Sequence, residues 1–176
     1  MENWNLKLFL KINRLIGQNK WLDAFGSSGA EWVIFGALGW YITASIINGL
    51  PNKQEAIIPI LFFGFAWIIG WFLSLIIGLI VKEKRPHITH PEIKTMYKPL
   101  MYWKSFPSDH TMTTFLFFFL SLVFGLPFSW ALLFLALWVS WGRVYAGFHY
   151  PFDIVGGLSL AGLVSIFVYY LYLIIF

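Results

Sequence analysis

The chain has 176 residues, of which 59% are hydrophobic, 21% are aromatic and only 11% are charged. A soluble domain carries roughly 25% charged residues and about 45–50% apolar ones. A chain of about 150 residues still exposes close to a third of its unfolded surface, so its core cannot bury this many apolar side chains. The composition excludes an ordinary soluble monomer and a disordered chain. We expect one membrane-embedded domain over residues 1–176.

The net charge is +4, from 12 Lys and Arg against 8 Asp and Glu, and the chain has no cysteine. Disulfides, thiolate metal sites and cysteine nucleophiles are therefore excluded. In a membrane protein, excess positive charge indicates anionic lipid headgroups or an anionic substrate as partners. A nucleic-acid partner is not expected, because the only basic run is the short stretch 82–85.

The first 29 residues mix apolar and charged positions. Leu8 and Ile12 fall near one helical face, and Lys7 and Lys11 fall near the other. This pattern predicts an amphipathic segment at the membrane interface over residues 1–29.

Five apolar stretches follow, and they predict membrane-spanning helices, since a hydrocarbon core of about 30 Å takes roughly 20 residues. The stretches are 32–50, 56–81, 109–125, 127–141 and 153–176. If the first segment also inserts, the count is six. The predicted fold is all-α: a polytopic membrane bundle of five to six transmembrane helices with an N-terminal interfacial helix.

Because successive spans alternate in direction, the N-terminal segment, the loop 82–107 and the loop 142–151 share one membrane face. That face carries 11 of the 12 Lys and Arg residues, leaving Lys53 opposite. Ionisable groups gathered at span ends indicate a functional site, with the loop 82–107 as an active-site loop. The positive-inside rule places this face in the cytoplasm.

The side chains on this face suit phosphate chemistry. Arg85 and Arg143 carry planar guanidinium groups that bind phosphate in a bidentate manner. Ser108 precedes a predicted helix that starts near Asp109, and the free N–H groups of a helix start favour an anion. Taken singly, these residues are also typical interfacial anchors and helix caps, so it is their gathering on one face that indicates a site.

Two histidines complete the set. His110 and His149 offer one nucleophile and one general acid, and the residues alone leave open which is which. Asp153 follows His149 by four residues, so one helical turn lets its carboxylate orient that imidazole. This spacing favours His149 as the nucleophile. The set suffices for phosphoryl transfer without a metal.

Three motifs resemble the signature of the type 2 phosphatidic acid phosphatase superfamily, which also includes the vanadium haloperoxidases. They are Arg85-Pro86, Pro107-Ser108-Asp109-His110 and Arg143-x5-His149-x3-Asp153, and the resemblance covers roughly residues 78–157. The wording of the second and third motifs is most similar to the bacterial undecaprenyl-diphosphate phosphatase branch.

The resemblance implies a vanadium-haloperoxidase-like phosphatase core and hydrolysis of a lipid phosphate, best matched by undecaprenyl diphosphate, with no metal or other cofactor. It implies that His149 forms a phosphohistidine, Asp153 orients it, and His110 protonates the leaving oxygen. The phosphoryl oxygens would be bound by Arg85, Ser108, the Asp109 N–H and Arg143. It also implies an extracytoplasmic site, in conflict with the positive-inside rule.

The sequence departs from the family pattern at three positions. Gly78 stands where the family usually has a lysine, Asp109 where it has glycine, and Gly142 where it has serine. Lys82 and Lys84 lie near the first position and are auxiliary candidates for the missing phosphate contact, although neither has the family spacing.

Other functions stay open at this stage. A lipid phosphate monoesterase acting on phosphatidylglycerophosphate, phosphatidate or a lipid A phosphate is the main alternative. A transporter or a non-catalytic lipid-binding protein is less favoured, because the ionisable groups lie at span ends rather than at mid-span. His87, His90 and Glu92 could bind a metal, but flanking prolines argue against a regular helix there, and we expect no metal site. The sequence does not indicate an oligomeric state.

Overall fold

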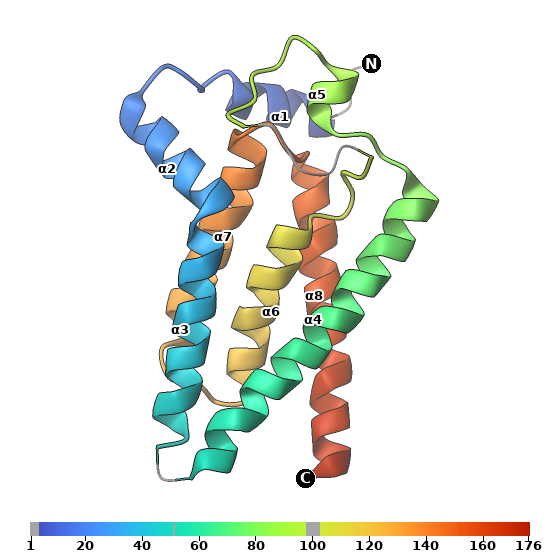
Figure 1. The fold of residues 1–176 in the computed structure, drawn as a ribbon. Coiled ribbons are helices and arrows are strands. Elements are labelled where there is room, and N and C mark those ends of the chain that lie inside the picture. Colours follow the sequence, from blue (N-terminus) through green and yellow to red (C-terminus); the bar gives the residue numbers. More distant parts are fainter. Residues whose placement is uncertain (1–3, 51, 98–102) are drawn as a thin grey trace.

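The computed structural model describes residues 4–50, 52–97 and 103–176. In these ranges the regular structure is helical (Figure 1). The helices are α1 (Trp4–Asn13), α2 (Lys20–Glu31), α3 (Val33–Asn48), α4 (Lys53–Val81), α5 (Pro86–Thr89), α6 (Asp109–Val123), α7 (Ser129–Tyr145) and α8 (Pro151–Ile175). The predicted all-α bundle is confirmed.

The five helices expected as spans, α3, α4, α6, α7 and α8, run lengthwise through the molecule (Figure 1). By length and composition, two described stretches can cross a membrane unaided: residues 55–89, which contain most of α4, and α8. A third span results if α2 and α3, which meet at a bend of 57°, are counted as one. The apolar helix α6 has 15 residues and α7 has 17, so each is shorter than a full span.

The loops gather as the alternation of spans predicts. The helix α1, the segment 82–97 with α5, and the connection from α7 to α8 lie at one end of the bundle (Figure 1). The turns from α3 to α4 and from α6 to α7, together with the C-terminus, lie at the other end. We call the first of these the loop end.

The structure divides the segment 1–29 into two helices with different roles. Gly17, with a φ of 84°, lies in the turn between them, where glycine adopts left-handed backbone without strain. The helix α1 lies across the loop end, with Phe9 fully buried against Val144 and Tyr150. The helix α2 packs against α7 instead.

Small residues let α2 and α7 approach closely. A Cβ on Gly26 would lie 2.2 Å from the Tyr145 ring, and one on Gly142 would lie 2.4 Å from the Ala30 backbone nitrogen. The serine usual in the family at position 142 would therefore collide with α2. This contact explains the departure at Gly142.

The helix α6 is the centre of the bundle and packs against α3, α4, α7 and α8. Most of its side chains are buried, including Phe115, Phe117 and Phe118 of its phenylalanine-rich run. The Phe117 ring stacks on Phe63 of α4 with centroids 4.3 Å apart. This packing fixes the start of α6, which carries the second motif, relative to the surrounding helices.

Candidate active site

His149 and Asp153 form a buried pair at the start of α8. The distance from His149 Nδ1 to Asp153 Oδ2 is 3.2 Å, and both side chains are at most 3% exposed. Pro151 is the first residue of α8, a position that suits its fixed φ. The residue before a proline prefers extended backbone, as Tyr150 shows with a ψ of 156°. His149 therefore lies just outside the helix while Asp153 lies one turn inside it.

Asp153 both caps α8 and contacts His149. Its Oδ2 accepts hydrogen bonds from the Tyr150 backbone N–H at 2.9 Å and from the Ser105 hydroxyl at 2.6 Å, besides facing the imidazole. With Nδ1 engaged by the carboxylate, His149 keeps Nε2 for chemistry. Asp153 therefore caps α8 and lies in contact with the His149 ring, and its role in orienting a nucleophile stays a prediction.

The two predicted arginines are buried at the loop end, where backbone carbonyls fix them. Arg85 precedes α5 and donates from Nε to the Lys104 carbonyl at 3.1 Å. Arg143, near the end of α7, donates from Nη1 to the Ala30 carbonyl at 2.9 Å and lies 4.7 Å from the centroid of the Phe148 ring. These contacts leave part of each guanidinium group available for an anion.

Backbone hydrogen bonds join the three motifs into one unit. The Ser105 N–H donates to the Glu83 carbonyl at 2.9 Å, which ties the residues just before the second motif to those just before the first. The Ser108 N–H donates to the Asp153 carbonyl at 3.1 Å, which ties the second motif to the third. Gly147, with a φ of 83°, lies so near Lys94 that a Cβ would be 2.5 Å from its carbonyl oxygen. The site thus depends on loop packing as well as on helices.

A cavity of about 770 Å³ brings the predicted residues together. Both histidines and both arginines line it, together with Asp109. The cavity continues between α3 and α4, where apolar side chains line it: Ile34, Phe35, Leu38, Phe63, Trp67 and Trp71. The helices α3 and α4 diverge towards the loop end (Figure 1), so the charged and apolar parts form one continuous space.

Other predicted residues lie outside this lining. Ser108 is fully buried, and its hydroxyl accepts the Thr111 N–H at 3.5 Å as the cap of α6. Lys82 and Lys84 are exposed, and Lys84 lines a different cavity. Their roles as phosphate contacts stay predictions.

Sequence reasoning missed Lys104 as part of the site. Its side chain is 5% exposed, and its Nζ donates to Asp109 Oδ1 and to Ser74 Oγ, each at 2.6 Å. The family spacing relative to Arg85 does not point to Lys104, because Lys104 follows Arg85 and approaches the site from the far end of the loop. The available clue was a lysine three residues before the second motif, which begins at Pro107.

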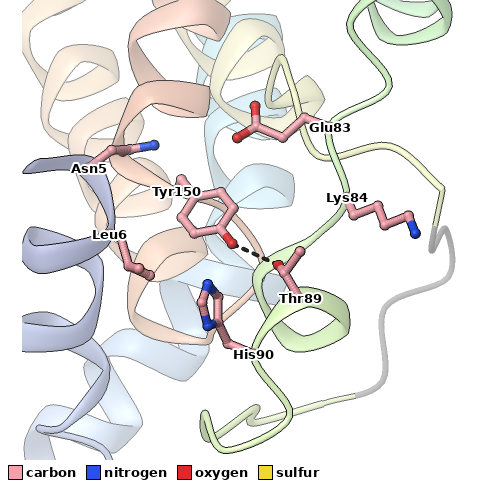
Figure 2. Close-up of a pocket in the computed structure, with 7 residues that line it drawn as sticks. All are labelled: Asn5, Leu6, Glu83, Lys84, Thr89, His90 and Tyr150. Carbon is pink, nitrogen blue, oxygen red and sulfur yellow. Dashed lines mark hydrogen bonds between the residues drawn. The ribbon is translucent and has the colours of Figure 1, made fainter. Parts of the chain in front are cut away.

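The second cavity, of about 220 Å³, shares no lining residue with the first (Figure 2). The Tyr150 hydroxyl lies 2.9 Å from Thr89 Oγ1 there, with the Glu83 carboxylate above the ring. His90 lines this cavity too and lies 3.3 Å from Glu92. No group of three or more potential metal ligands occurs in the described ranges.

The electrostatic environment keeps the nucleophile candidate uncharged. Burial, with the positive charges of Arg143 and Arg85 nearby, holds the pKa of His149 well below its usual range. A neutral imidazole retains the lone pair that attacks phosphorus. Burial and the two arginines therefore favour the neutral form of His149, which is the form that the predicted nucleophile needs.

The family model described as the PAP2 superfamily matches residues 59–175, well over half of the chain. The chain belongs to the PAP2 superfamily. It is a membrane phosphatase, a hydrolase of phosphate esters or diphosphates. Five residues of the three motifs line the cavity described above: Arg85, Asp109, His110, Arg143 and His149.

Curated relatives match over nearly the whole chain. YbjG of Escherichia coli (strain K12), provisionally named an undecaprenyl-diphosphatase, is 30% identical over 166 residues, covering 94% of this chain and 80% of YbjG. Two Bacillus proteins named BcrC are each 28% identical. The Bacillus subtilis (strain 168) protein, an undecaprenyl-diphosphatase, is covered to 78%, with 89% of this chain. The Bacillus licheniformis protein, named a bacitracin transport permease protein, is covered to 79%, with 94% of this chain.

The solved structures confirm the fold. LpxE of Aquifex aeolicus superposes with a TM-score of 0.71 at 22% identity, covering 95% of both chains. This similarity extends over the whole bundle and concerns the fold alone.

Proposed function

We propose that this protein hydrolyses undecaprenyl diphosphate to undecaprenyl phosphate and inorganic phosphate. The observation that carries the proposal is the single cavity in which Arg85, Arg143 and His149 share a space with the apolar walls of α3 and α4. Such a cavity suits a ligand with an anionic headgroup and a long hydrocarbon tail. The names of the BcrC and YbjG relatives support a polyprenyl diphosphate within that class.

In the first step, His149 Nε2 attacks the terminal phosphorus and forms a P–N bond as the bridging P–O bond breaks. His110 donates a proton to the leaving oxygen, which departs as undecaprenyl phosphate. Asp153 holds the imidazole and stabilises its positive charge. Arg85, Arg143, Ser108 and the Asp109 N–H at the start of α6 bind the phosphoryl oxygens.

In the second step, water attacks the phosphohistidine. His110, now neutral, takes a proton from the water, and the P–N bond breaks to release inorganic phosphate and free His149. Every group used is a side chain or backbone N–H of this chain, so the proposed reaction needs no metal or cofactor.

A substrate panel tests this proposal. The purified protein is given undecaprenyl diphosphate, phosphatidylglycerophosphate, phosphatidate and a lipid A phosphate, and phosphate release is measured with EDTA present. The proposal predicts the highest kcat/KM on undecaprenyl diphosphate. A clear preference for a monoester would overturn the substrate assignment, and loss of activity in EDTA would overturn the metal-free mechanism.

We propose further that the loop end faces the outside of the cell membrane, as the resemblance implies. Its excess of basic residues is then explained by recruitment of an anionic substrate rather than by the positive-inside rule. Because the chain has no cysteine, Lys94→Cys and Leu50→Cys introduce unique, exposed thiols at opposite ends. An impermeant maleimide added to intact cells should label only the first. Labelling of only the second would reverse the orientation.

A further inference from the structure

Lys104 is an ammonium group buried beside the phosphate cavity. Burying a charge is costly unless it is paired, and Lys104 Nζ is paired with Asp109 Oδ1 at 2.6 Å. The Asp109 side chain is 31% exposed and lines the cavity together with Arg85 and His149. The carboxylate of the ion pair therefore forms part of the cavity wall, and the Lys104 ammonium group lies directly behind it.

The stem of Lys104 lies across Gly78 of α4. A Cβ on Gly78 would lie 2.8 Å from Lys104 Cδ and 2.9 Å from its Cγ. Position 78 therefore faces the space that the Lys104 stem already fills. A long side chain at position 78 and the present course of Lys104 exclude each other, so Gly78 is what allows the loop to deliver this ammonium group.

Asp109 and Ser74 hold that ammonium group in place. Asp109 Oδ1 accepts from both Lys104 Nζ and the Ser74 hydroxyl, the latter at 2.5 Å, and Lys104 Nζ also lies 2.6 Å from Ser74 Oγ. An ammonium group has three N–H donors. These two contacts leave one donor without a partner among the described residues.

We propose that Lys104 is the third cationic phosphate-binding residue of the site, stored by Asp109 in the free enzyme and transferred to a phosphoryl oxygen when substrate binds. A phosphate approaching Asp109 is repelled by its carboxylate and attracted by the ammonium group. A lysine ammonium is a compact charge on a flexible stem, so a small rotation exchanges one oxygen partner for another. Lys104 also holds Arg85 through its carbonyl, so one loop residue supports two cations.

This proposal rests on the proposed phosphatase function, and Lys104→Met tests it. Methionine keeps an unbranched stem over Gly78 and removes the charge. We expect kcat/KM for the lipid phosphate to fall roughly ten- to hundredfold, as for loss of a charged hydrogen bond, mainly through KM. Inhibition by inorganic phosphate should weaken in parallel. Lys11→Met, at an exposed lysine of the same end, should leave both quantities unchanged.

A double variant separates phosphate binding from simple neutralisation of Asp109. If Lys104 only offsets the Asp109 charge, Lys104→Met combined with Asp109→Asn should restore wild-type kcat/KM. The proposal expects the double variant to stay well below wild type, because the cation that binds the phosphoryl oxygen is absent from it. Full recovery in the double variant would overturn the proposal.

A positional swap tests the same idea without relying on one variant's stability. Gly78→Lys alone should lose activity, because its side chain collides with the Lys104 stem, and Lys104→Ala alone should lose the cation. The combination should regain most of the lost kcat/KM. A combination no better than Lys104→Ala in a protein that retains its melting temperature would contradict the proposal. If the wild-type protein does not release phosphate from any lipid tested, the proposed function is wrong. The affinity for inorganic phosphate, compared between wild type and Lys104→Met, then still measures the contribution of Lys104.

Discussion

His149 and Asp153 meet across four residues at the start of one helix, whereas Lys104 meets Ser74 across thirty residues and Asp109 at the start of a different helix. Both sets lie beside the same cavity, with His149, Asp153 and Lys104 buried and Asp109 31% exposed. The first is fixed by the start of α8, because His149 lies just before the helix and Asp153 lies in its first turn. The second depends on how a long loop returns to α4. His149 and Asp153, which are close in sequence, form what we call the local half of the site. Lys104, Ser74 and Asp109, which a long loop brings together, form the non-local half.

The largest expected effect is in the local half. His149→Gln removes the attacking nitrogen, so phosphate release should fall by roughly a thousandfold or more. The measurement is phosphate release from undecaprenyl diphosphate, with circular dichroism confirming the helical fold. Retention of more than a tenth of wild-type turnover would remove His149 from the mechanism.

A smaller loss is expected when the orienting carboxylate is neutralised. Asp153→Asn keeps the size of the side chain but weakens its hold on the His149 tautomer, so kcat should fall roughly a hundredfold or more. Ser105→Ala, which removes a single donor to Asp153, should cost only about tenfold. The reverse order, measured in the same assay, would mean that Asp153 serves mainly as a helix cap.

The pH dependence also reports on the local half. Protonation removes the lone pair of His149, so kcat/KM falls as pH falls through its pKa. Since burial and the two arginines depress that pKa, activity should persist below about pH 6.5, where a free histidine becomes protonated. Arg85→Gln removes one positive charge and should move the acid limb to higher pH. An acid limb that moves to lower pH would contradict the electrostatic assignment.

The smallest effect on kcat/KM is expected for the exposed lysines, Lys82 and Lys84, in contrast to the buried Lys104. Lys82 and Lys84 are exposed, and exposed charge pairs contribute little. The double replacement Lys82→Met with Lys84→Met should change kcat/KM by less than about threefold at 0.15 M salt, where charges beyond roughly 8 Å are screened. A loss as large as that of Lys104→Met would return them to the role of phosphate contacts.

Much of the local half could be predicted from the sequence, and little of the non-local half could. The spacing of His149 and Asp153, and the helix start at Ser108, follow from short-range geometry. The function of Gly78 could not be predicted, because the side chain that fills its space comes from Lys104. Likewise, Gly142 gave no signal until the close packing of α2 on α7 was visible.

The bundle shows the same division. The five long apolar helices and the common location of the loops follow from hydropathy and alternation. The placement of α2 along α7 did not follow, because the charges of residues 1–29 indicated the interface, while the contact depends on Gly26 and Gly142. Glycine adds little to the hydropathy of a segment, yet it lets two helices pack closely. Its effect is therefore visible only in the three-dimensional structure.

The central claim is that His149 carries the phosphoryl group between substrate and water. The most direct measurement is a rapid acid-free quench with undecaprenyl diphosphate labelled on its terminal phosphate, followed by mapping of the label by mass spectrometry. We expect an acid-labile phosphohistidine at His149 that disappears in His149→Gln. Label found on His110, or turnover without any phosphorylated enzyme under conditions where the second step is slowed, would contradict the account.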